Sequence, residues 1–354
     1  MNDVIVNGQA HGSVAARLLS CGFNANALRP WVGRDGRSYI TQNSRGKSVA
    51  VPLIGNTAAT LRKDEWKLLD EAVVGVARQR LRIVSALRGA GLQYTIPQGM
   101  GKTVLETQTM TDITDAEMHM DPAVPTEQDR PHFDLTTLPL PVIHKDFSFS
   151  AREIAVSRNG GSPLDVTGAE LATRKVAEAA EKLTLGVSST YKFGGGTIYG
   201  LINYPNAITT VTLTAPTATA WTPEDTVEEV LAMRHASQDA LHYGPWMLYN
   251  SPAWDQYLDR DYNTTSGKTL RARLSEISNI RGVETADYMG SGFKMVLVQQ
   301  TSDVVRMVVG MDVTTVQWES MGGLRVHFKV MAILVPQVRC DSNSNTGIVY
   351  ATTE

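Results

Sequence analysis

The stretch that most constrains the fold of this chain is residues 162–186, SPLDVTGAELATRKVAEAAEKLTLG, which predicts one long helix with defined ends. Thr167 is expected to be the N-cap, and Glu170, three residues later, completes a capping box. Gly186 follows the last periodic residue, at the position where a left-handed residue commonly ends a helix. About eighteen residues at ~1.5 Å each predict a rod of roughly 27 Å.

This helix is amphipathic, with an apolar stripe rich in alanine, so whichever element packs on it approaches closely. On the opposite side, charged residues follow at four-residue steps and alternate in sign. The stripe comprises Ala169, Ala172, Val176, Ala179, Ala180 and Leu183, and the charged series comprises Glu170, Arg174, Glu178 and Lys182.

Composition limits the class of protein. A chain of 354 residues forms one large domain or two to three smaller ones, and its 42% hydrophobic and 19% charged residues are typical of a globular protein. The formal net charge of -3 argues against a protein built mainly to bind nucleic-acid phosphates, although a local basic face remains open. Cys21 and Cys340 lie far apart, which favours a reducing compartment and leaves a single bridge open. We expect no signal peptide and no membrane span.

The first half of the chain contains two segments with little core of their own. Residues 1–60 carry turn signals between short β-type runs and are expected to form an extended arm that needs another surface for its order. A helix is predicted over 61–88. Nearly fifty residues, 92–138, then show little core signal, which indicates either disorder or a projecting hairpin.

The second half alternates helical and β-type patterns. A strand with Phe147 and Phe149 on one side leads into the long helix, and 197–300 predicts a mixed α/β lobe. Within that lobe, a helix starting near Thr222 or Asp225 precedes a buried strand, Trp246–Tyr249, and a helix that starts at Ser251-Pro252. Three strands follow, VVRMVVG, VTTVQWES and LRVHFKVMAILVPQV, the last with the period-2 alternation of a half-buried strand after a Gly322-Gly323 turn.

Taken in this order, the elements resemble the major capsid proteins of tailed bacteriophages with the Hong Kong 97 type fold, and in particular its encapsulin-like branch. The piece that carries the resemblance most specifically is 228–258, a helix, then GPW-LYNSP, then a helix. The resemblance covers about 60–354 as an order of elements. Residues 1–60 and the loop that follows the first helix are longer than in a simple encapsulin, which favours the viral type.

The resemblance implies an α+β fold with a defined division of the chain. The expected parts are an N-terminal arm (1–60), an N-terminal helix (61–91), an extended loop (92–138), a peripheral domain (139–196) whose spine helix spans 167–185, an axial or apical domain (197–300), and a second part of the peripheral domain (301–354).

The resemblance also implies a function. It predicts a structural protein, not an enzyme, whose copies form the pentamers and hexamers of an icosahedral phage head through contacts of the arm and the extended loop. Double-stranded DNA would be packaged without sequence-specific contacts, and portal, scaffold and decoration proteins are further candidate partners. The expected location is the virion, assembled in the cytoplasm of the bacterial host. The alternative is an encapsulin-like compartment that packages an enzyme.

The physical properties of the chain agree with this. An arm and a long loop without a core are entropically costly unless they bury surface on neighbouring copies. Contacts of that head-to-tail kind close into rings.

Chemical motifs receive weaker interpretations. One group of acidic residues and a histidine, named below, would support a metal-dependent hydrolase. Because the group lacks a fixed ligand spacing, we prefer to interpret it as a solvated acidic loop. This group comprises Asp112, Asp115, Glu117, His119 and Asp121. We therefore assign no catalytic, cofactor-binding or metal-binding residues and expect no cofactor.

Other short motifs also have structural explanations. Residues 99–103 and 267–269 resemble phosphate-binding loops, but Ile96 and Tyr262 replace the first glycine. His144-Lys145-Asp146 and His235 lack a nucleophile arranged for catalysis. The aromatic residues Trp246, Tyr249, Trp254 and Tyr257 are expected in the core. By the resemblance, Lys102 is the one candidate in the extended loop for a Lys–Asn isopeptide bond between subunits.

Overall fold

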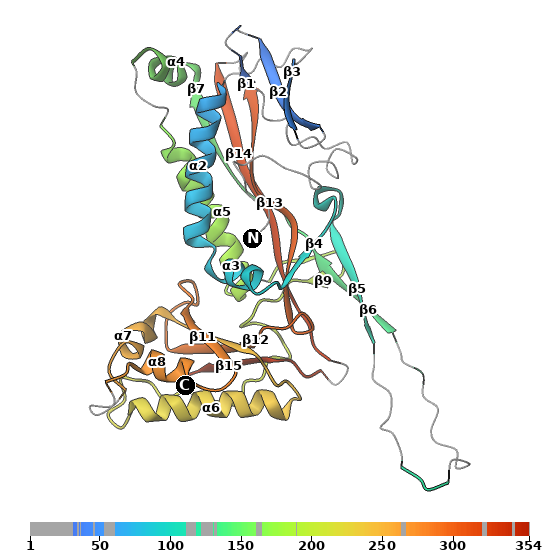
Figure 1. Cartoon of the computed structure of the whole chain (residues 1–354), viewed down its shortest axis with the longest axis vertical. Coiled ribbons are helices and arrows are strands. Elements are labelled where there is room, and N and C mark those ends of the chain that lie inside the picture. Colours follow the sequence, from blue (N-terminus) through green and yellow to red (C-terminus); the bar gives the residue numbers. More distant parts are fainter. Residues whose placement is uncertain are drawn as a thin grey trace. The chain divides into compact units, whose positions relative to one another are not determined.

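The computed structural model describes residues 31–33, 35, 37–44, 47–52, 61–110, 118–121, 130, 133–160, 165–188, 190–262, 267–320, 324–341 and 344–353. The chain forms two compact units, each assembled from separate segments of the sequence (Figure 1). The first unit comprises Met1–Thr103, Leu140–Thr184 and Met307–Pro336, and the second comprises Val104–Pro139, Leu185–Arg306 and Gln337–Glu354.

The first unit is built on a four-stranded sheet in the order β4-β13-β14-β7. Its strands are β4 (Gln93–Thr95), β7 (Ile143–Ser150), β13 (Val305–Ser320) and β14 (Arg325–Val338). Its helices are α2 (Lys63–Arg80), α3 (Arg82–Gly89), the short 3-10 helix η1 (Gly99–Gly101), α4 (Ala151–Gly160) and α5 (Thr167–Leu185). Part of the predicted arm forms a separate sheet of three strands, β1 (Trp31–Val32), β2 (Ser38–Ser44) and β3 (Lys47–Pro52). Residues 1–30 of the arm lie outside the described residues.

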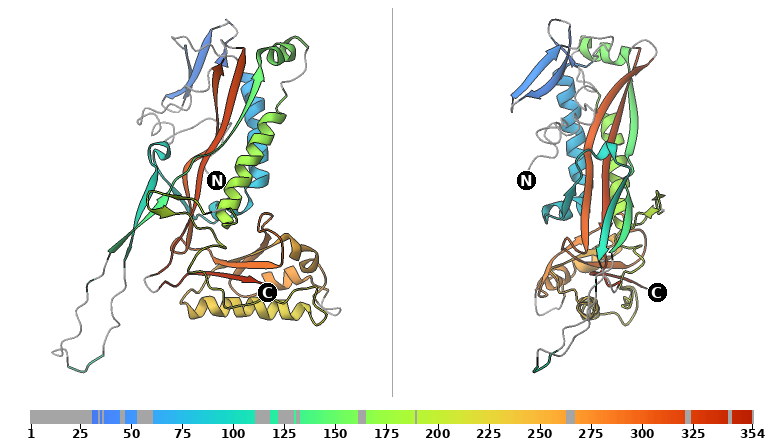
Figure 2. Two further views of the ribbon diagram at one scale, coloured as in Figure 1. Left: turned by 180° about the vertical axis from the view of Figure 1, so that it is seen from behind. Right: turned by 90° about the vertical axis from the view of Figure 1, so that its right-hand side faces the viewer.

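Helices α2 and α5 cover one face of the four-stranded sheet, as the two views of Figure 2 show. Aromatic side chains join the two layers. The Trp66 ring of α2 meets Phe328 of β14 edge-on at 5.7 Å, and Phe328 stacks on Phe147 at 5.1 Å. Phe149 also contacts Phe328, so the prediction that both phenylalanines of β7 lie on one side is confirmed.

The predicted spine helix is present as α5, with one correction at its start. Thr167 is the first helical residue and not the N-cap, because the Glu170 backbone N–H donates to the Val166 carbonyl at 3.0 Å. The Thr167 N–H donates to the Asp165 carboxylate at 3.0 Å and not to Glu170, so the predicted capping box is wrong. Gly186 has φ +82°, which confirms the left-handed end. The alanine stripe is also confirmed in most positions, but Ala179 is exposed and Thr173 and Ala177 are buried in its place.

The single helix predicted over 61–88 is wrong, because the helix breaks at Leu81. The φ/ψ of Leu81, −86° and 67°, separates α2 from α3. Glu181 of α5, which is only 2% exposed, accepts a hydrogen bond from the backbone N–H of Val84 at 3.3 Å. The Val84 N–H in the first turn of α3 is thus satisfied by a residue 97 positions later in the chain. Signals within residues 61–88 therefore do not show this break.

The strands after residue 300 also differ from the prediction. VVRMVVG and VTTVQWES form one strand, β13, because Gly310 continues the strand instead of ending it. Position 310 is a glycine because the η1 backbone packs directly on it: a Cβ on Gly99 would lie 2.4 Å from the Gly310 backbone. A Cβ on Gly310 itself would lie 2.8 Å from the Ile333 side chain. The predicted alternation in β14 is confirmed at Val326 and Phe328, which are fully buried, but Leu324 is 69% exposed and residues 331–335 are buried on both faces of the strand. The predicted Gly322-Gly323 turn lies outside the described residues.

The second unit is built on a four-stranded sheet in the order β11-β10-β12-β15, in which β10 pairs parallel with β11 and antiparallel with β12. The strands of this sheet are β10 (Trp246–Asn250), β11 (Ile280–Thr285), β12 (Lys294–Gln299) and β15 (Ile348–Thr352). The helices are α6 (Pro223–Asp239), the 3-10 helix η2 (Pro252–Trp254), α7 (Asp255–Leu258) and α8 (Leu270–Ser275). Two hairpins complete the unit, β5 (Val104–Met110) with β6 (Phe133–Pro139), and β8 (Lys192–Phe193) with β9 (Gly196–Thr197).

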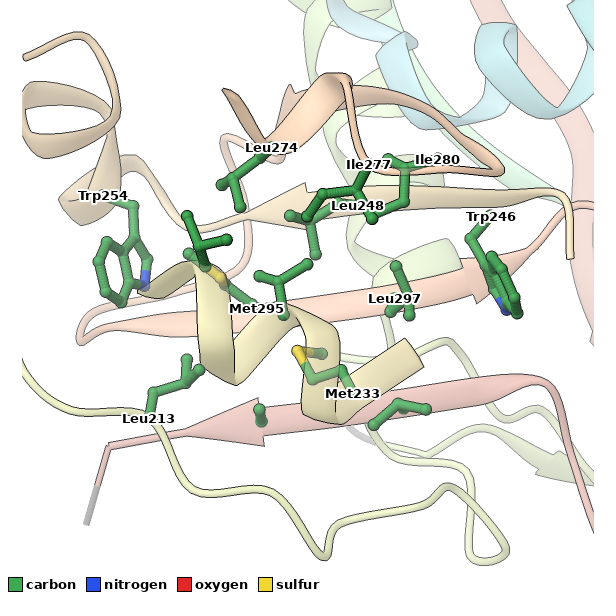
Figure 3. Packing of buried hydrophobic residues seen from close by; sticks show 14 of the residues in the cluster. Leu213, Met233, Trp246, Leu248, Trp254, Leu274, Ile277, Ile280, Met295 and Leu297 are labelled. Carbon is green, nitrogen blue, oxygen red and sulfur yellow. The ribbon is translucent and has the colours of Figure 1, made fainter. Parts of the chain in front are cut away.

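The core of the second unit lies between this sheet and α6, with α7 and α8 adding side chains (Figure 3). Trp246, Tyr249 and Trp254 are fully buried, which confirms the prediction that these aromatic residues belong to the core. The predicted start of α6 near Thr222 is confirmed, and Thr222 forms a capping box with Asp225.

The predicted grouping of 301–354 as one part is wrong at its end. Strand β15 pairs antiparallel with β12 from Lys294↔Thr352 to Val298↔Ile348, so it completes the sheet of the second unit. Residues 307–336 remain with the first unit. The sequence predicts no strand after residue 338, and a strand's pattern in any case carries no information on which sheet it joins.

Candidate assembly surfaces

The predicted extended loop is a β-hairpin in its described part. Strands β5 and β6 pair antiparallel in regular register from Val104↔Pro139 to Met110↔Phe133. The sequence left disorder and a projecting hairpin as alternatives, and for these two strands the hairpin is confirmed.

The two faces of this hairpin have different chemistry. One face carries Thr107 and Thr136, whose hydroxyl oxygens lie 3.0 Å apart. The other face carries Phe133 and Leu135, each 58% exposed. Because residues two apart on a strand lie on the same face, these two side chains form one apolar surface, which we call the hairpin face. At 118–121, Met118 and Met120 are also fully exposed.

The base of the hairpin is anchored within the second unit. Leu105 and Leu138 are 9% and 8% exposed, and the Gln337 amide donates to the Thr107 hydroxyl at 3.3 Å. Gly196 of β9 lies against β6, where a Cβ would come within 2.3 Å of the Thr137 carbonyl oxygen. A fixed base therefore carries a hairpin whose far end exposes large apolar side chains.

Two ion pairs hold the elements of the first unit in place. Arg158 of α4 donates to both carboxylate oxygens of Glu65 on α2, each at 2.7 Å. Burial raises the pKa of Glu65, but the hydrogen bonds from Arg158 and from the Arg62 backbone offset it, so the pKa falls below its ordinary value. Arg88 of α3 contacts Asp312 of β13 at 2.9 Å. Burial of the Asp312 carboxyl outweighs the charge and the hydrogen bond of Arg88 and raises the pKa of Asp312 to about 6.

The residues singled out as possible metal ligands are only partly described. His119 and Asp121 are exposed, while Asp112, Asp115 and Glu117 lie outside the described residues. Within the described ranges, no three His, Cys, Asp or Glu side chains gather in a way that would hold a metal ion.

The motifs that resemble phosphate loops have structural roles. Gly99–Gly101 is the 3-10 turn η1, packed by its first glycine on β13. The Thr269 hydroxyl caps α8 by accepting from Ala272, and Lys268 pairs with Glu276 at 2.6 Å. Lys102 is exposed next to the start of β5, and its cross-linking role stays a prediction.

The histidines considered for catalysis lie at the surface. His144 and Asp146 on β7 are 3.9 Å apart, and Lys329 approaches the same carboxylate at 3.6 Å. His235 contacts Asp239 one turn later on α6, at 2.9 Å. These are surface pairs on regular elements, as expected from the sequence.

The sequence analysis missed the hairpin face. Phe133 and Leu135 were included in a segment judged to have little core signal, which is correct for the folded chain because neither side chain joins its core. The available signal was the alternation of apolar and polar residues in FDL, which is typical of a strand with one apolar face. Among the described helices, none combines the length and apolar character needed to cross a bilayer.

Comparison with known proteins relates this architecture to shell proteins. The family described as "Family of unknown function (DUF6260)" matches residues 56–351. The Type 1 encapsulin shell protein EncA of Myxococcus xanthus (strain DK1622) is 25% identical over 306 residues, which cover 81% of this chain and 93% of EncA.

Solved structures show the same fold at low sequence identity. A virus-like particle from Pyrococcus furiosus aligns with a TM-score of 0.57 at 18% identity, covering 82% of this chain and 98% of that one. The capsid of Myoviridae Phage XM1 aligns with a TM-score of 0.56 at 10% identity, covering 76% and 91%. The predicted α+β class and the encapsulin-like Hong Kong 97 type capsid fold are therefore confirmed.

Proposed function

The chain belongs to the family described as a family of unknown function, DUF6260, and for this member we propose a role as the major capsid protein of a tailed, double-stranded DNA bacteriophage. Its copies would assemble as pentamers and hexamers into a closed icosahedral head. The work of the protein in this role is mechanical, and no catalytic residue is assigned.

The observation that carries the proposal is the hairpin face. Phe133 and Leu135 are 58% exposed on a hairpin whose base is fixed by buried leucines. Large apolar side chains clustered at a surface mark an interaction site in a soluble protein. In a fold shared with shell proteins, the fitting partner for this face is a neighbouring copy of the same chain.

The viral form of the proposal rests on the N-terminal segment. The family match begins at residue 56, so the three-stranded sheet of residues 31–52 precedes it. A further sheet ahead of α2 adds surface that a neighbouring subunit would cover, in addition to the surface provided by the hairpin.

The second candidate is an encapsulin-like compartment that encloses an enzyme. It is favoured by the similarity to EncA, which extends over 93% of that shell protein. Both candidates require closed shells, and they differ in what the shells contain.

Electron microscopy of the purified protein, followed by analysis of nuclease-treated particles, tests both. The proposal predicts closed shells, and in an infected or producing host it predicts protected double-stranded DNA inside them. A single protein species enclosed in place of nucleic acid would favour the compartment. A monomer in solution at all concentrations and salt conditions would refute both candidates.

A further inference from the structure

The small hairpin of β8 and β9 exposes two aromatic side chains. Tyr191 is 44% exposed and Phe193 is 51% exposed, so neither belongs to the core of the second unit. Because residues two apart along an extended chain point to the same side, both rings lie on one side of the hairpin. The turn itself is made by Gly194 and Gly195, which have φ of +58° and +80°. The turn therefore does not need aromatic residues beside it.

The register of this hairpin gives the direction of the Phe193 side chain. Phe193 pairs with Gly196, and directly opposite residues of an antiparallel pair have their Cβ positions on the same face. A Cβ on Gly196 would lie 2.3 Å from the Thr137 carbonyl oxygen and 2.9 Å from the Pro139 ring, both in β6. The face that carries Phe193 is therefore the face that packs on β6.

The small hairpin packs on the same side of β5 and β6 as the hairpin face. Pro139, Leu135 and Phe133 are separated by even numbers of residues along β6, so their side chains lie on one face. A Cβ on Gly194 would lie 2.9 Å from the side chain of Val104, which pairs with Pro139 on this face. The aromatic pair of β8 thus continues the hairpin face. We call the combined surface the apolar strip, and its members are Phe133, Leu135, Tyr191 and Phe193.

Packing within the chain does not account for the apolar strip. The opposite face of β5 and β6 carries Leu105 and Leu138, which are buried and anchor the hairpin. The members of the strip are each 44–58% exposed, so they add little to this anchoring. Large apolar side chains gathered on one surface of a soluble protein mark an interaction site.

The area of the strip determines how it can bind. A large apolar side chain buries about 150–250 Å², so four side chains that are 44–58% exposed offer roughly 400 Å². With an equal area from a partner, the contact buries roughly 800 Å² in total, less than the ~1,200 Å² of a stable complex. One strip contact is therefore too small to hold two chains together, whereas many contacts formed at once in a closed assembly are sufficient.

We infer that the apolar strip binds a second copy of this chain, through contacts that are individually too weak to give a stable dimer. The inference rests on the proposed shell function and adds to it Tyr191 and Phe193 as contact residues and a cooperative mode of association. The partner is a copy of the chain because the strip continues the hairpin face, which that function assigns to a neighbouring copy. Shells should therefore form abruptly above a threshold concentration, from a pool of single chains.

The test compares the full-length wild type with Y191S/F193S and with L241S/Y243S. Leu241 and Tyr243 belong to the same unit and are 63% and 61% exposed, so the control variant removes a similar apolar area outside the strip. Thermal melting of the unassembled chains verifies that both variants fold, as expected for replacements of exposed side chains.

The first readout is the threshold concentration for shell formation, followed by light scattering and sedimentation velocity. Y191S/F193S should raise this threshold roughly tenfold or more, because it removes about half of the strip area. L241S/Y243S should leave the threshold unchanged. Below the threshold, the wild type should sediment as a single chain.

The second readout is hydroxyl-radical footprinting of the wild type, before and after assembly. Oxidation of Tyr191 and Phe193 should fall severalfold in shells, whereas oxidation of Tyr243 should not change. This readout requires no substitution, so it decides on the strip even if Y191S/F193S does not fold.

Different results would overturn different conclusions. Unchanged oxidation of Tyr191 and Phe193 in shells, or a wild-type threshold for folded Y191S/F193S, would refute the strip and leave the shell function intact. An equal rise of the threshold in L241S/Y243S would show that exposed apolar area in general, and not the strip, drives association. A stable dimer below the threshold would overturn the cooperative mode. A wild type that forms no shells at any concentration would refute the shell function itself.

Discussion

Replacement of the hairpin face is the most direct test of the shell function. In F133S/L135S, the two side chains that are exposed in the single chain become polar, while the pairing of β5 with β6 is retained. Because neither side chain contributes to the core, the melting temperature of the unassembled chain should stay close to that of the wild type.

The size of the effect follows from the surface that remains to be buried. Aromatic side chains bury about 150–250 Å² each, and Phe133 and Leu135 are each 58% exposed, so together they retain roughly 200 Å² for an interface. At ~25 cal/mol per Å², this corresponds to about 5 kcal/mol for each hairpin contact. Such a loss lowers the association constant of one contact by a factor of roughly several thousand, and the loss recurs at each subunit of a shell.

Sedimentation velocity and electron microscopy provide the assay. F133S/L135S should sediment as small species at concentrations where the wild type forms shells. Leu105→Ala is the contrasting variant, since Leu105 is 9% exposed at the hairpin base and its truncation should lower the melting temperature. Wild-type-like shells from F133S/L135S would refute the assignment of the hairpin face as an interface.

Three further predictions concern the first unit. Glu65→Gln should lower the stability of the first unit by about 1–3 kcal/mol at neutral pH. Because the pKa of Glu65 is depressed in the folded state, the difference in melting temperature from wild type should vanish as the pH falls through that pKa. The pKa of Asp312 is raised to about 6, so wild type should lose stability relative to Asp312→Asn as the pH rises from about 4 to 6, and a difference that is constant over this range would contradict this. Gly99→Ala should destabilise by about 1–3 kcal/mol because its Cβ would lie 2.4 Å from the Gly310 backbone, whereas Gly101→Ala, with open space around its Cβ, should be nearly neutral in chemical denaturation.

Elements with strong local signals were predictable from the sequence. Helix α6 has a proline in its first turn and a capping box of Thr222 and Asp225, and the period-2 pattern of β14 matches its buried face at Val326 and Phe328. Helix α5 was recognised from its stripe and from Gly186. In each case the information that forms the element lies within the element itself.

Features that depend on distant residues were not predictable in the same way. The break at Leu81 involves Glu181, and the one-strand character of β13 involves the close approach of Gly99 to Gly310. The helix α4 and the strand β11 were missed because each is short and has a weak pattern. The hairpin face required knowledge of which apolar residues the folded chain leaves exposed, and burial is a property of the three-dimensional structure.

The position of β15 has a consequence for protein synthesis. Strand β12 ends at Gln299, and the strand that pairs with it, Ile348–Thr352, is translated only about fifty residues later. Until then, one edge of the sheet has exposed backbone groups, which favour incorrect pairing with other nascent chains. A polypeptide that terminates early cannot close this edge, so the order of translation itself excludes incomplete products from the pool of competent subunits.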